Sequence, residues 1–169
     1  LSDEELEEMR HQVLKSQRIK WGEFNIERDF LLLHKEGTKL LYEVDGFLSE
    51  SGGEIPIRPS SRSMFHFQDF WGKPIKPYVE LSKMPVEVIG TDSKHFMATS
   101  FEQLFHEMVH VHQFLQYGRH RYTLMFHKNT YADGRKYEGV NYPNWREEKA
   151  VYWTNLFRLE WKGEGRGEY

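Results

Sequence analysis

The segment from residue 100 to residue 118 constrains the fold more than any other part of the sequence. Its large apolar residues recur at helical spacing and form one broad face, made of Phe101, Leu104, Phe105, Met108, Val111 and Leu115. Ser100 can cap the start of such a helix together with Gln103, and Gly118 stands where a helix-ending glycine is common. A helix with so wide an apolar face needs partners on several sides, which predicts a place at the centre of the core.

The composition predicts one folded domain over residues 1–169. Only 38% of the residues are apolar but 15% are aromatic, so large rings are expected to fill much of the core. The net charge of −3 argues against a nucleic-acid partner, because such binders are usually basic. No apolar stretch is long enough to span a membrane. The acidic start of the chain is unlike a signal peptide. The absence of cysteine removes disulfides, thiolate metal sites and cysteine nucleophiles together.

The local patterns predict an α+β fold, in which a small sheet from residues 20–90 packs on the helix at 100–118. The strands expected within residues 30–49 depend on turn signals at Gly37 and at Asp45-Gly46. The predicted segments are, in order, a helix at 3–18, short strands within 30–49, a loop at 50–62, β-like runs at 78–81 and 86–89, a loop at 118–143 and a helix at 144–161.

The run HEMVH places two histidines, His106 and His110, four residues apart on the predicted central helix. Four residues turn roughly 400°, so both rings leave the same face about 6 Å apart along the axis. Two imidazoles at this spacing can bind one tetrahedral Zn²⁺ ion. Glu107, next to His106, can serve as the general base that takes a proton from water. This motif therefore predicts a zinc site with hydrolytic chemistry.

The third protein ligand is expected on the last predicted helix. Positions 113 and 116 are both glutamine, which excludes the third histidine of the metzincin pattern. The run WREEKAVYW instead offers Glu147 and Glu148, and Glu147 with Ala150 resembles the ExxA motif of the gluzincins. Glu148 is the alternative ligand. Glu147 could also have a purely structural role, as the capping-box partner of a helix that begins at Asn144.

The runs HEMVH, EEKAV, NLFR and the terminal RGEY together resemble secreted bacterial effector metalloproteases of the NleD type and, more distantly, clostridial neurotoxin light chains. The resemblance covers roughly residues 98–169 and implies a zinc-dependent endopeptidase of zincin fold, secreted or delivered into a target cell, with a protein or peptide substrate. It also implies that Arg166 and Tyr169 stabilise the tetrahedral intermediate. An edge strand before the motif would line the cleft and pair with an extended substrate, a role that residues 78–81 or 86–89 would serve.

Two other interpretations stay open at this point. His120 or His127 could be the third ligand, as in SprT-like DNA-associated proteases. His112 is not a candidate ligand. It lies two residues after His110 and therefore points to a different face of the helix. The second alternative is a non-enzymatic domain in which zinc only staples the fold. Structural zinc sites have four protein ligands, and the sequence offers no evident fourth one, which favours an enzyme.

Overall fold

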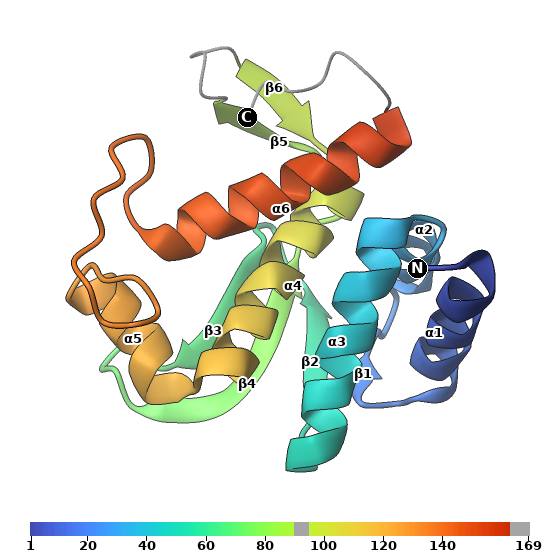
Figure 1. Cartoon of the computed structure of the whole chain (residues 1–169), viewed down its shortest axis with the longest axis horizontal. Helices are drawn as coiled ribbons and strands as arrows, with labels where there is room; N and C mark the ends of the chain where they lie inside the picture. Colours follow the sequence, from blue (N-terminus) through green and yellow to red (C-terminus); the bar gives the residue numbers. More distant parts are fainter. Residues whose placement is uncertain (90–94, 163–169) are drawn as a thin grey trace.

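The computed structural model describes residues 1–89 and 95–162, which form six helices and six strands in an α+β arrangement (Figure 1). The helices are α1 (Asp3–Lys15), α2 (Asn25–Leu32), α3 (Lys35–Ser51), α4 (Ser100–Tyr117), α5 (Arg119–His127) and α6 (Trp145–Lys162). The strands are β1 (Ile19–Lys20), β2 (Ile55–Pro59), β3 (Met64–Gln68), β4 (Pro74–Leu81), β5 (Val86–Ile89) and β6 (His95–Ala98). None of the described helices is both long and apolar enough to cross a membrane.

The main sheet is mixed and has the strand order β1-β2-β4-β3. Strands β1, β2 and β4 run parallel, whereas β3 pairs antiparallel with β4 and forms an edge. Ile57 of β2 and Phe65 of β3 both lie opposite Val79 of β4, and all three side chains are buried in the core. Helix α4 packs against β3 and β4, so this face of the sheet supports the HEMVH helix. Strands β5 and β6 form a separate antiparallel hairpin.

Helix α4 lies at the centre of the core, as its wide apolar face predicts. It packs against α2, α3, α5 and α6, and Figure 1 shows α6 crossing it. Its cap differs from the prediction, because the helix begins at Ser100 and Thr99 is the capping residue. The Thr99 hydroxyl accepts a hydrogen bond from the backbone N–H of Glu102, and the Gln103 amide instead donates to the Ala98 carbonyl.

The prediction of short strands within residues 30–49 is wrong, because these residues form the end of α2 and most of α3. Gly37 marks a close approach between the two helices rather than a turn. A Cβ atom there would lie 2.1 Å from the backbone carbonyl oxygen of Leu31, so only glycine lets α3 begin so near α2. The buried stripe along α3 has helical spacing and consists of Leu40, Leu41, Val44 and Leu48.

Two predicted loops also contain regular structure. Residues 50–62 include β2, whose buried Ile55 and Ile57 alternate with less buried neighbours. Residues 118–143 include α5. The two faces of this helix differ little in hydrophobicity, so its sequence has no clear helical periodicity. The other segments agree with the predictions. The helices at 3–18 and 144–161 are α1 and α6 with ends shifted by a few residues, and the runs at 78–81 and 86–89 belong to β4 and β5.

Candidate metal centre

Three side chains from two helices converge beside the sheet: His106 and His110 of α4 and Glu147 of α6. Nε2 of His110 lies 2.9 Å from Oε1 of Glu147, and Nε2 of His106 lies 3.3 Å from Oε2. One ligand atom from each residue lies within 4.8 Å of the other two. A tetrahedral ion with ligands at about 2.0–2.1 Å would separate them by about 3.3 Å. The three residues therefore form a group that could hold a metal ion.

The structure distinguishes the two adjacent carboxylates of α6. Glu147 belongs to the group, whereas Glu148 does not. The backbone N–H of Glu147 donates to Oδ1 of Asn144 at 3.0 Å, so the predicted helix cap at Asn144 is present. This cap uses the main chain of Glu147 and leaves its side chain free to reach the histidines. The capping interpretation and the ligand interpretation are thus compatible.

The electrostatics of the group keep the Glu147 carboxylate ionised. Burial would raise the pKa of Glu147, but its bonds to His106 and His110 and their charges hold that pKa far below its ordinary value. Burial by itself lowers the pKa of His106, yet contact with Glu147 and the charges of Glu107 and Glu147 raise it overall. The Glu147 carboxylate is therefore stabilised by positive charge on the two imidazoles. A bound divalent cation would supply that positive charge in place of the imidazole protons.

Gln113 fixes the orientation of His110. Nδ1 of His110 lies 3.0 Å from Oε1 of Gln113, and Nε2 of Gln113 donates to the Arg146 carbonyl at 3.1 Å. The second bond identifies which end of the amide faces the histidine, because only the NH₂ end can donate to a carbonyl. His110 therefore donates from Nδ1 to Gln113 and directs Nε2 at Glu147, where a metal ion held between them would bind the Nε2 lone pair. This role of Gln113 is not evident from the sequence, where the residue serves only to exclude the metzincin pattern.

Glu107 is held outside the ligand group by strand β3. Its Oε1 accepts a hydrogen bond of 3.0 Å from the backbone N–H of Phe65. The strand beside the site is therefore β3 and not residues 78–81, which lie inside the sheet as part of β4. Val86 of β5 lines a cavity next to His106, but β5 belongs to the separate hairpin. The expectation that residues 78–81 form the edge strand is wrong, because the pairing of β3 with β4 cannot be deduced from hydrophobic pattern alone.

Two cavities lie near β3, one beside the residues that precede the strand and one along the strand itself. One, of about 290 Å³, contains His106 and Glu107 together with Ser61, Arg62 and Ser63. The other, of about 470 Å³, runs along β3 and is closed by side chains of α5 and α6, including Phe126, His127 and Arg146. Arg62 lines both cavities. The side chains of His106 and Glu147 are 25% and 36% exposed, so a ligand entering from this side can reach the group.

Tyr122 is a second residue that the sequence analysis missed. Its ring is buried, and the guanidinium of Arg146 lies over it at 4.0 Å. Burial, and after it the charges of Glu107 and Glu147, raise the pKa of Tyr122, although Arg146 opposes them. The hydroxyl therefore stays protonated, within electrostatic range of the two glutamates. No spacing rule links residue 122 to the HEMVH run, so only the packing of α5 against α4 and α6 reveals it.

The remaining histidine candidates lie elsewhere. His120 and His127 are exposed on α5 and are not part of the group. His112 is buried on another face of α4, with Nε2 at 3.2 Å from Oε1 of Glu43. Arg166 and Tyr169, the two expected oxyanion donors, lie outside the described residues.

Comparisons with protein-family models, curated proteins and solved structures find no match to this chain. The assignment of a metal-binding group therefore depends on the geometry of His106, His110 and Glu147 themselves.

Proposed function

We propose that the chain is a zinc-dependent endopeptidase of zincin type, with His106, His110 and Glu147 as the metal ligands. The observation that carries the proposal is the division of roles among four neighbouring side chains. Three converge on one point, while Glu107 is held apart by the Phe65 N–H and opens on a cavity shared with His106. Three protein ligands with a carboxylate beside them is the pattern of catalytic zinc sites, which keep one coordination position open.

Zinc bound here would supply a Lewis acid and lower the pKa of water at the open position. The chain's own residues would do the rest. Glu107 would take the proton from the attacking water and pass it to the leaving amine. Its Oε1 is engaged by Phe65, and among the described residues its Oε2 has no hydrogen-bond partner and is left for that water. Tyr122, kept neutral by burial, is a candidate donor to the developing oxyanion.

The free edge of β3 supports a peptide substrate. In the part of the chain that the structure describes, β3 pairs with β4 on one side only. The larger cavity runs along β3, and the smaller one, which contains His106 and Glu107, lies beside residues 61–63 that lead into the strand. An extended peptide could pair with this edge through its main chain and place alternate side chains in the cavities. Its scissile bond would then lie between His106 and Arg146.

The decisive experiment separates metal binding from catalysis. Glu107→Gln should keep about one zinc per chain, because Glu107 is not a ligand. Cleavage of a proteome-derived peptide library should fall at least about a hundredfold, as expected for a lost general base. Glu138→Gln, an exposed substitution of the same kind outside the site, should leave cleavage unchanged. Full cleavage by Glu107→Gln, or a metal-loaded wild-type chain that cleaves nothing, would show the proposal to be wrong.

A further inference from the structure

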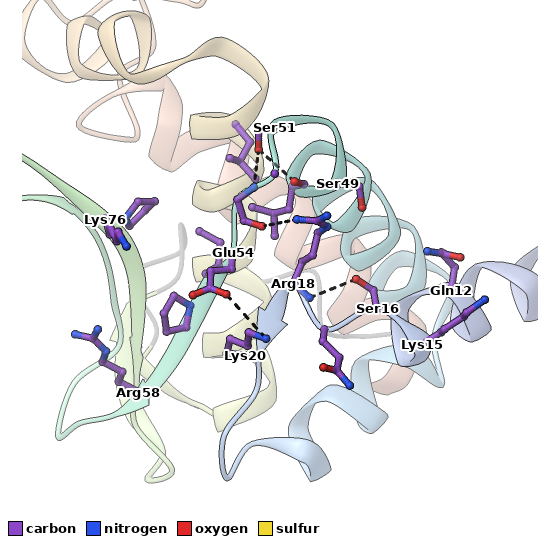
Figure 2. A pocket seen from close by; sticks show the side chains of 18 residues that line it. Gln12, Lys15, Ser16, Arg18, Lys20, Ser49, Ser51, Glu54, Arg58 and Lys76 are labelled. Atoms are coloured by element: carbon purple, nitrogen blue, oxygen red, sulfur yellow. Dashed lines mark hydrogen bonds and ion pairs between the residues drawn. The ribbon is translucent and has the colours of Figure 1, made fainter.

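A third cavity shares no residue with the metal group or with the two cavities beside it. It has a volume of about 960 Å³, which is within the size range of small-molecule sites. Its walls come from the ends of α1 and α3, from β1, from β2 as far as Arg58, from the first half of β4 and from Leu115 of α4 (Figure 2). Buried Leu48 and Ile55 contribute to its lining, so the cavity lies directly against the core.

The cavity is strongly cationic. One carboxylate, Glu54, is set against five cationic side chains, which are Lys15, Arg18, Lys20, Arg58 and Lys76. The whole chain has a net charge of −3, so this local excess of positive charge is opposite in sign to the net charge of the protein. Like charges brought together repel one another, and a cleft lined by one sign draws counter-ions from solution. The most direct relief of this repulsion is an anionic ligand.

Most of these cations have no acidic partner. Lys20 lies 3.9 Å from Glu54, and Arg18 donates to the Gly53 carbonyl at 3.2 Å. Lys15, Arg58 and Lys76 form no ion pair with any described residue. Figure 2 shows Glu54 and Lys20 in the middle of the cavity, with Arg58 and Lys76 on one side and Lys15 and Arg18 on the other. Glu54 therefore occupies the place where an incoming anion would be best surrounded.

We propose that this cavity binds a small anion that carries several phosphate groups. The cations lie on two sides of the cavity, which suits a ligand with charge at more than one position better than a single carboxylate. Arginine and lysine are the usual partners of phosphate oxygens. The hydroxyls of Ser16 and Ser49 line the same space and can donate further hydrogen bonds. Glu54 competes for Lys20 and limits the affinity.

The test is a calorimetric titration of the zinc-loaded full chain with inorganic tripolyphosphate and, separately, with orthophosphate. Tripolyphosphate should bind saturably and more tightly than orthophosphate, with an affinity that falls as salt rises. The double variant Arg58→Gln/Lys76→Gln should bind it roughly tenfold more weakly or worse, because two charge-assisted contacts are lost. The control Arg121→Gln/Lys128→Gln removes the same charge from exposed positions outside the cavity and should bind like the wild type. Any contact of tripolyphosphate with zinc is common to both pairs, so their difference reports the cavity.

Glu54→Gln provides a test in the opposite direction. It removes the internal competitor and should tighten tripolyphosphate binding several-fold, a gain that misfolding cannot imitate. The absence of saturable binding, or equal losses in the two double variants, would overturn the proposal. Tighter binding of a single-stranded oligonucleotide than of tripolyphosphate would overturn it too, because the surface would then be one for nucleic acid. None of these outcomes depends on whether the chain is a peptidase.

Discussion

Gln113 accepts a hydrogen bond of 3.0 Å from Nδ1 of His110, one helical turn before it on α4, and so directs the other ring nitrogen at Glu147. The amide is anchored in turn by the main chain of Arg146 on α6. The residue that orients a ligand histidine thus also joins the two helices that supply the ligands. Partners of this kind fix the tautomer of a metal-binding histidine and increase its basicity.

Gln113→Leu should therefore weaken zinc binding while every ligand stays in the chain. Loss of such a partner typically costs about 10- to 100-fold in metal affinity. The measurement is a competition titration against a zinc chelator of known strength. Gln116→Leu, on an exposed position of the same helix, is the control and should bind zinc like the wild type. Equal affinities of the two variants would mean that His110 is oriented by packing alone.

Glu147→Gln and Glu148→Gln are a matched pair of adjacent substitutions on α6. The first removes the carboxylate that contacts both histidines and should lower zinc affinity by more than roughly 100-fold. The second changes a carboxylate outside the group and should leave zinc content near one per chain. Elemental analysis after dialysis against a weak chelator distinguishes them, and the reverse ranking would contradict the ligand set.

Two glycines of α3 should respond in opposite directions to the same substitution. Gly37→Ala would place a methyl group 2.1 Å from the Leu31 carbonyl oxygen and should destabilise the fold by about 1–3 kcal/mol. Gly46→Ala meets no atom within 4 Å and should stabilise it by about 0.5–1 kcal/mol, because alanine favours helix interiors. Urea denaturation measures both free energies of unfolding. A neutral Gly37→Ala would show that α2 and α3 can separate at little cost.

The C-terminal residues Arg166 and Tyr169 remain a prediction from the resemblance to toxin proteases. Tyr169→Phe, or truncation after Gly163, should lower kcat by roughly 100- to 1,000-fold, the usual effect of losing an oxyanion donor. Zinc content and melting temperature should stay nearly the same. Tyr152→Phe, on an exposed tyrosine of α6, serves as the control. A truncated enzyme with full kcat would leave Tyr122 as the remaining candidate donor.

Much of the centre of this protein could be predicted from sequence, because the relevant signals are local. A helix carries its own period, so the apolar face of α4 and the shared face of His106 and His110 follow from spacing within one segment. The same holds for the ends of α4 and α6, where Gly118 and Asn144 act within a single turn. These features do not depend on what the rest of the chain does.

Tertiary structure decided the choice between Glu147 and Glu148. Adjacent residues on a helix point about 100° apart, so the ligand is whichever one the rotation of α6 turns toward α4. Apolar residues lie on several sides of α6, and Tyr152, Leu156 and Leu159 are exposed, so periodicity selects no face. Contacts with α4 decide which face of α6 is buried. The residues buried on the same side as Glu147 are Ala150, Thr154 and Phe157. Arg158, which is also buried on that side, pairs with Glu102 of α4.

The position of β3 and the place of Gly37 within a helix were also decided by contacts between segments. β3 borders the site because it pairs with β4 and because its Phe65 N–H reaches Glu107, a residue 42 positions later. Gly37 suggests a turn when taken alone but is required in a helix by the nearby carbonyl of Leu31. Packing between segments supplies the free energy that selects the pairing of β3. In α3 the stripe of Leu40, Leu41, Val44 and Leu48 does have helical spacing, but the turn signals at its glycines outweighed that pattern in the prediction.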